Sequence, residues 1–568
     1  MQSSGQDCKV KMREYILEGK ILVQLLLFNG RNVKKFGILK RIIRYGLILI
    51  IIFITLVLFY LAFEFINQKA WVKDQQVTVK ELTPQQKEDD FRYLTQIVHE
   101  YYPFEEANKK VKGLQDLGEM NDIYINKAKG TKNNREFLEL FNEYLQRIHQ
   151  TGHAYIINPN EAKAMNTFSN RTLFGIKKDS FNKTDYWFNL WNSISVSVYA
   201  DVDVLYEKGS YYVAKDFSAE DRYIPRGSKI LRINGMSTDE YVKLLQNKHW
   251  LRYDHENNKV FISDPFIVDS GDKKNFWNVE FELINGKISC EKITKRFGRK
   301  KDLRFDNNSY NHTFCYELNN EVGYIRVWQF LSDYSSDNEM IQTFMKNSNG
   351  KYKKLIIDIR GNDGGDPKYW MKVLIEPLVK RTTYYECYAG VTKEFLSKKG
   401  ILFEIYRLAQ GGLFNKENYN FYDAEKSDYY NAYGKDLQFY KVTKKFEPTN
   451  SFPFEGEVYL LVDQDCFSAA EDFASAVKGM KLATLVGANT QGGTATLLPP
   501  YAFCLPESGV MFAMETEITY TSDGKIDEIY GTAPDIELEE STYPTTYPLS
   551  ADKEEILKDT WIQQVLNY

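Results

Sequence analysis

The chain has 568 residues, of which 43% are hydrophobic and 26% charged, and its formal net charge is −4. This length suits three or four domains, and the apolar content is enough for ordinary cores, so a disordered or collagen-like protein is excluded. The charged content excludes a polytopic membrane protein, and the nearly balanced charge argues against a protein dedicated to binding nucleic acid.

Positive charge gathers near the N-terminus. Residues 1–44 contain ten Lys or Arg and three Asp or Glu, and residues 46–63 then read GLILIIIFITLVLFYLAF without a charge. A helix of that length spans about 27 Å, close to the hydrocarbon thickness of a bilayer. The positive-inside rule then predicts a basic cytoplasmic segment at 1–45, a transmembrane anchor at 46–66 and an extracytoplasmic remainder. A cleaved signal peptide, giving a secreted protein, is the alternative, although no small-x-small cleavage site follows the apolar run.

Helical patterns follow the apolar run. Thr83, followed by a proline, is typical of a helix start, and residues 134–150 repeat apolar side chains at three- and four-residue spacing. The second pattern breaks at Gly152, and strand-like residues come next. We therefore expect His153 at a corner between a helix and a strand.

Residues 196–297 read as short strands. Within IPRGSKILRINGMSTDEYVKLL (224–245), a glycine turn precedes an apolar strand, Asn234-Gly235 predicts a tight turn, and a helix begins just after it. This order resembles the carboxy-terminal half of a PDZ domain, which implies a PDZ-like peptide-binding module. The carboxylate-binding loop of PDZ domains is not evident.

Residues 315–545 read as an α/β module. EVYLLVD (457–463), a helix of small residues (468–479) and ATLVGA (483–488) predict a β-α-β unit. The stretch 381–450 is rich in Tyr, Lys and Asn without clear periodicity. It is interpreted as an insertion or lid over the site.

A glycine-rich loop ends another buried strand of this module. The sequence DIRGNDGG (358–365) can place backbone N–H groups in a cleft, where they bind a phosphate or a developing oxyanion. Neither G-x-x-x-x-G-K-[ST] nor G-x-G-x-x-G is present, so nucleotide binding is disfavoured.

Ser468 follows a strand and opens the helix of small residues. Such a hydroxyl is most often an N-cap. The alternative is a nucleophile whose oxyanion is stabilised by the positive helix end and by the N–H of Ala469.

His149 and His153 form a His-x-x-x-His pair. Two imidazoles at this spacing can share a metal, but no Glu lies between them and no third ligand is apparent. We expect no metal and no other cofactor.

Five ordered motifs together resemble the C-terminal processing (tail-specific) peptidases and their tricorn-core relatives. They are IHQTGHAY (148–155), LIIDIRGNDGG (355–365), LVDQDCFSAAE (461–471), ATLVGANTQG (483–492) and GTAPDI (531–536). The resemblance covers roughly residues 85–565. It implies an α/β core with the ClpP/crotonase-like spiral fold, preceded by a helical segment and carrying an inserted PDZ-like β domain.

One departure bears on the mechanism. The processing-peptidase branch uses a Ser–Lys dyad, but Gly493 stands where its lysine should be. The tricorn-like branch instead uses a histidine from the early Gly-His motif. By this resemblance, Ser468 is the nucleophile and His153 the general base.

The tricorn-like branch also implies supporting groups. A late carboxylate orients the imidazole, for which Glu528 is the candidate, with Asp527 and Glu517 behind it. The backbone N–H groups of Gly364 and Ala469 are expected to form the oxyanion hole.

The sequence thus predicts a membrane-anchored, extracytoplasmic serine endopeptidase that cleaves unfolded proteins or peptides. A catalytically inactive relative that binds peptides or ligands, an anchored scaffold and, last, a crotonase-type acyl-CoA enzyme are the alternatives. We expect no nucleic-acid partner, and the oligomeric state is left open. The predicted parts beyond the anchor are an N-terminal helical part with the His motif (80–195), the PDZ-like domain (196–297), the peptidase core (315–545) and a C-terminal helix (546–568).

Overall fold

The computed structural model describes most of the chain beyond residue 78. The described residues are 79–105, 108–109, 117–166, 174–194, 198–207, 209–219, 222–247, 249–254, 257–266, 274–297, 313–348, 350–400, 414–415, 437–449, 454–494, 496, 499–521, 525–538 and 553–568. Within these ranges no helix combines the length and apolar character that crossing a bilayer requires. The anchor predicted at 46–66 lies outside the described residues and stays a prediction.

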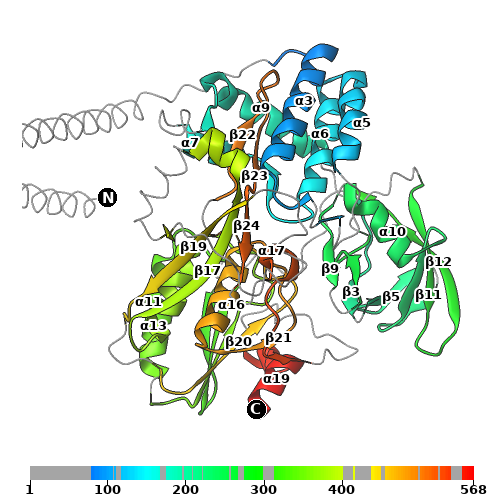
Figure 1. Ribbon diagram of the computed structural model, residues 1–568. Helices are drawn as coiled ribbons and strands as arrows, with labels where there is room; N and C mark the ends of the chain where they lie inside the picture. Colours follow the sequence, from blue (N-terminus) through cyan, green and yellow to red (C-terminus); the bar gives the residue numbers. More distant parts are fainter. Residues whose placement is uncertain are drawn as a thin grey trace, which may run out of the picture. The chain divides into compact units, whose positions relative to one another are not determined.

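The helical part begins as predicted. The Thr83 side chain accepts the N–H of Gln86, whose own side chain accepts the N–H of Thr83, so a capping box starts the first helix. Edge-to-face contacts join the buried rings of Phe91, Phe137 and Tyr144, and Figure 1 shows the helices that carry them as neighbours. The main helices here are α3 (Pro84–Tyr101), α5 (Leu117–Gly130), α6 (Asn134–Ile148) and α9 (Lys178–Ile194).

The core sheet has the strand order β14-β15-β16-β20-β21-β25. Its members are β14 (Thr313–Asn319), β15 (Val322–Val327), β16 (Lys354–Asp358), β20 (Glu457–Val462), β21 (Thr484–Gly487) and β25 (Ile536–Glu537). All neighbours from β15 to β25 pair in parallel, and α16 (Ala469–Met480) connects β20 to β21, which confirms the predicted β-α-β unit. Every residue of β15 and β16 is buried, as expected for apolar runs inside a layered α/β core. The carboxyl ends of β16 and β20 lie together, so the loops that follow them meet at one edge of the sheet.

The two ends of the segment 381–450 are regular strands. They are β17 (Thr383–Thr392) and β19 (Leu437–Phe446), which pair antiparallel along their whole length, and β17 also pairs with β24 (Glu517–Tyr520). These ends therefore extend a sheet of the core, where the sequence suggested only an insertion or lid. The stretches 401–413 and 416–436 lie outside the described residues.

A second sheet, with its own cluster of buried apolar residues, occupies the region predicted as PDZ-like. Its strand order is β12-β11-β7-β4-β3. The Asn234-Gly235 turn has φ values of 52° and 84°, as a tight hairpin turn requires, and Ser237 caps the following helix. The strands are β3 (Val204–Glu207), β4 (Ser210–Val213), β7 (Lys229–Ile233), β11 (Phe276–Glu282) and β12 (Ile288–Thr294), and the helix is α10 (Thr238–Leu244). The likeness to a PDZ domain stays a prediction.

Candidate active site

Ser468 sits in a strained turn between β20 and α16. Its φ is 59° and its ψ is −122°, a region that costs a non-glycine residue free energy and often marks a functional site. The side chain caps no helical N–H, so the N-cap interpretation is wrong. Its backbone N–H donates to the carbonyl of Gly492 at 3.0 Å.

The Ser468 hydroxyl faces a histidine from a distant part of the chain. The distance between Ser468 Oγ and His153 Nε2 is 3.1 Å. His153 lies between α6 and β1 (Ala154–Ile156), at the predicted helix-to-strand corner. The structure therefore brings together the two residues that the sequence singled out as nucleophile and base.

Glu515 completes this hydrogen-bond chain. Its Oε2 lies 3.0 Å from His153 Nδ1 and also accepts the backbone N–H of His153 at 2.8 Å. The pairing of β1 with β23 (Met511–Met514), in which Ala154 lies opposite Met514, places the carboxylate there. Gly152 leaves the necessary room, because a Cβ at this position would lie 2.7 Å from Glu515 Oε2.

The carboxylates favoured by the sequence lie elsewhere. Glu528 accepts the Thr519 N–H at 2.6 Å and Glu517 accepts the Thr496 N–H at 2.5 Å, so the structure corrects the expectation that Glu528 orients the imidazole. Burial and the nearby charge of Glu515 raise the pKa of Glu528 well above its usual range. The sequence does not single out Glu515, whose only signal is a carboxylate inside the largely apolar run VMFAMETEITY.

The glycine loop lies directly beside the nucleophile. Gly364 has a φ of 103°, and a Cβ on it would lie 2.8 Å from Ala469 N and 2.9 Å from Ser468 Cβ. Its N–H donates to Asn362 Oδ1 at 2.8 Å, so the amide expected in the oxyanion hole has an internal acceptor in this state.

Aromatic side chains line the other side of the imidazole. The Phe467 ring lies 4.9 Å from the His153 ring and 4.7 Å from that of Trp250. The ring of His149 packs on the ring of Trp250, and His149 Nδ1 accepts the N–H of Ala154 at 3.2 Å. His149 therefore has a structural role here, and no group of three His, Cys, Asp or Glu within the described ranges could hold a metal.

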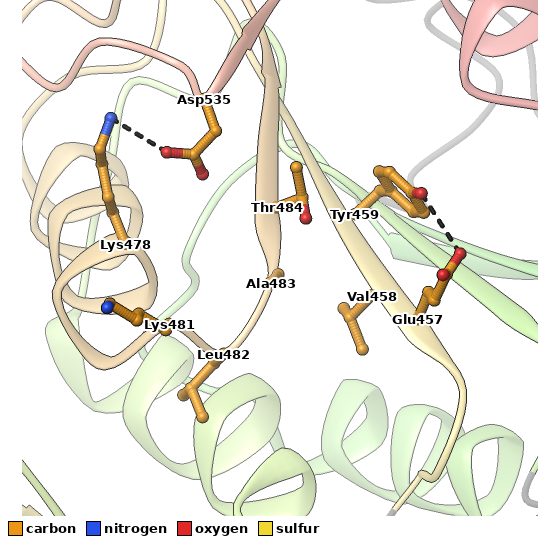
Figure 2. Close-up of a pocket in the computed structure, with 9 residues that line it drawn as sticks. All are labelled: Glu457, Val458, Tyr459, Lys478, Lys481, Leu482, Ala483, Thr484 and Asp535. Atoms are coloured by element: carbon orange, nitrogen blue, oxygen red, sulfur yellow. Dashed lines mark hydrogen bonds and ion pairs between the residues drawn. The ribbon is translucent and has the colours of Figure 1, made fainter. Parts of the chain in front are cut away.

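A cavity of about 540 Å³ lies away from this constellation. Figure 2 shows that it opens at the starts of β20 and β21 and the end of α16, whereas Ser468 follows the end of β20. An ion pair of 3.3 Å joins two of its residues, Lys478 and Asp535. The cavity is thus separate from the Ser468–His153–Glu515 chain.

Comparison with known proteins supports a peptidase. Residues 321–538 match the model of peptidase family S41. Mature CPAF complexed with lactacystin aligns over 85% of this chain and 99% of its own, with 14% identity and a TM-score of 0.50, which shows a shared fold.

Two other solved structures align with lower scores. The photosystem II D1 C-terminal processing protease aligns over 83% of this chain and 96% of its own, with 14% identity and a TM-score of 0.39. The tricorn protease aligns over 85% of this chain and 36% of its own, with 14% identity and a TM-score of 0.32. Curated protein sequences give no match.

Proposed function

We propose that this chain, a serine-type peptidase with a domain of peptidase family S41, cleaves peptide bonds through a Ser–His–Glu triad. Ser468 is the nucleophile, His153 the general base, and Glu515 the carboxylate that orients the imidazole. The observation that carries this assignment is the continuous chain of contacts from Glu515 Oε2 through both imidazole nitrogens to Ser468 Oγ.

The reaction proceeds in two halves. Ser468 Oγ bonds to the peptide carbonyl carbon while its proton passes to His153 Nε2. The C–N bond then breaks, and the imidazolium returns the proton to the departing amine. A water deprotonated by the same nitrogen attacks the ester and releases Ser468.

The tetrahedral oxyanion needs N–H donors. Ala469 is the first residue of α16, so its N–H has no acceptor within the helix and lies at the positive end of the helix dipole. Gly364 joins it when a bound peptide carbonyl displaces the Asn362 side chain from the Gly364 N–H.

The cellular setting is proposed from the sequence. The apolar run within 46–66 would hold the peptidase at the outer face of a membrane, and the second sheet would orient unfolded or peptide substrates, as a PDZ-like module does. We expect detergent to extract the full chain from membranes and alkaline carbonate to leave it bound.

The assignment is tested with the full chain in detergent. We would follow fragments of an unfolded protein by mass spectrometry and label the nucleophile with a fluorophosphonate. Ser468→Ala and His153→Ala should each lower kcat/KM by about 10³-fold or more. His99 is an exposed histidine near the end of α3. The variant His99→Ala is therefore the control and should cleave like the parent.

Each other outcome has a distinct meaning. Unchanged cleavage in Ser468→Ala would refute the triad. Cleavage lost in Ser468→Ala but kept in His153→Ala would require another base. A parent that binds peptides and cleaves none would favour the alternative of an inactive binding relative.

A further inference from the structure

Two buried carboxyl groups contact the loop that bonds the backbone of the nucleophile. Glu471, in the first turn of α16, has no exposed surface, and Asp527, the first residue of α17 (Asp527–Tyr530), is 1% exposed. Both carboxylates accept backbone N–H groups of one short loop, those of Gly492 and Thr494. Two ionised carboxylates only accept hydrogen bonds, so a bond between the members of this pair requires one proton.

The surrounding donors indicate which group holds that proton. Glu471 accepts the N–H of Gly492 at 3.1 Å and the hydroxyl of Thr532, so both of its oxygens already act as acceptors. Asp527 Oδ2 accepts the N–H of Thr494 at 3.3 Å. Asp527 Oδ1 is buried and receives no hydrogen bond from any residue in the described part of the chain. A proton on Asp527 Oδ1, donated to Glu471, satisfies this atom.

The environment disfavours a second negative charge. Burial, and then the charge of Glu471, raise the pKa of Asp527 well above its usual range, and burial also raises that of Glu471. Lys444 forms its ion pair with the neighbouring carboxylate of Asp472. The other titratable groups that face the pair are Glu528, Tyr385, Cys387 and Cys466.

The pair is connected to the nucleophile through one short loop. Glu471 and Asp527 accept the backbone N–H groups of Gly492 and Thr494, and the carbonyl of Gly492 accepts the N–H of Ser468. The position of the Ser468 backbone, with its strained φ, therefore depends on a loop that this pair holds.

We propose that Glu471 and Asp527 share a single proton, and that the singly charged pair is a positioning device for Ser468. Loss of that proton would place two adjacent negative charges in the core and push the loop 490–494 away from its bonds. The peptidase should then lose rate at alkaline pH for a reason independent of His153. This inference rests on the proposed function of the site.

Asp527→Asn imitates the protonated state permanently. The amide nitrogen of Asn can donate to Glu471 while its oxygen accepts the Thr494 N–H. We expect kcat at about pH 7 to fall less than about threefold, and the alkaline decline of the parent to disappear. Asp527→Ala and Glu471→Gln each leave a donor or acceptor unpaired, so kcat should fall about tenfold or more.

A measurement independent of activity completes the test. The infrared difference spectrum of parent minus Asp527→Asn at about pH 7.5 should contain the carbonyl band of a protonated carboxyl, in the Ser468→Ala background as well. Absence of the band, or an Asp527→Asn chain as slow as Asp527→Ala although equally folded by circular dichroism, would overturn the inference. A parent that shows the band but cleaves nothing would overturn the proposed function while supporting the shared proton.

Discussion

The ring of Phe467 occupies the space that a side chain at Gly493 would need. A Cβ on Gly493 would lie 2.7 Å from Phe467 Cδ2 and closer still to two other ring atoms. In the C-terminal processing peptidases that the sequence resembles, the Ser–Lys branch has its lysine at the position of Gly493. In this chain the ring that packs on His153 fills that space, which agrees with the proposed histidine base.

The first prediction concerns this close approach. Gly493→Ala should lower the free energy of unfolding by about 2 to 4 kcal/mol, because it adds a clash to the strain of a φ of 85°. Gly361→Ala is the matched control, since Gly361 has a φ of 73° but nothing within 4 Å of its would-be Cβ. The control should lose only about 1 to 2 kcal/mol in urea denaturation. Equal losses in the two variants would show that Phe467 yields readily.

The second prediction separates two buried carboxylates. Glu515→Gln should lower kcat/KM by about 10² to 10⁴-fold, because the amide cannot stabilise the imidazolium and favours the wrong tautomer. Glu528→Gln should lower it less than about tenfold, since Glu528 contacts the Thr519 N–H and not the imidazole. Kinetics on one peptide substrate compares them. A larger loss in Glu528→Gln would restore the assignment made from the sequence.

These two carboxylates show how far the sequence could predict the site. Ser468 and His153 are predictable because each lies in a local pattern. Ser468 follows a strand and opens a helix of small residues, and His153 lies in a Gly-His corner after a helix. The buried strands and the β-α-β unit were predictable for the same reason, since their patterns are contained in a few consecutive residues.

Glu515 depends on a non-local feature. It reaches His153 because β1 pairs with β23 in the register that sets Ala154 opposite Met514, across more than 350 residues of chain. A one-residue shift of that register would turn the carboxylate to the other face of the sheet, and no short pattern specifies the register. The same limit applies to strands β17 and β19, which pair with each other although more than 40 residues separate them in the chain, so their local sequence indicates only an insertion or lid.

The third prediction concerns the contact between Arg252, which lies on a short strand outside the second sheet, and the nucleophile loop. Arg252, in β9 (Arg252–Asp254), forms an ion pair with Asp465 and covers the ring of Trp250 at 5.6 Å. Trp250 in turn packs on Phe467, next to the nucleophile. Arg252→Met keeps much of the apolar stem but removes the charge, so kcat should fall about three- to tenfold as the loop loses its fixed position.

A matched variant controls for the general effect of removing a paired arginine. Arg222 also pairs with a carboxylate, that of Glu291 in β12, but its side chain is 63% exposed. Arg222→Met should change kcat less than about twofold. Similar rates for the two variants would mean that the Arg252 contact does not position the loop.

The last prediction is a pH dependence of stability set by Asp90. This residue of α3 is fully buried, and its two oxygens accept the N–H groups of Glu507 at 2.8 Å and Ser508 at 2.9 Å. Burial outweighs these bonds and raises its pKa from 3.8 to about 6. The folded state therefore binds this proton more tightly than the unfolded state, so the contribution to stability is complete below about pH 4 and is lost as the pH rises through about 6.

Asp90→Asn removes this titration. The free energy of unfolding of the parent, measured relative to Asp90→Asn, should therefore decrease by about 2 kcal/mol between pH 4 and pH 7. Urea denaturation at several pH values gives this difference, and Asp89→Asn, at the exposed neighbouring position, is the control. A difference that grows with pH would mean that the two backbone donors stabilise the carboxylate more than burial penalises it, because the sign of the slope follows directly from which of the two effects is larger.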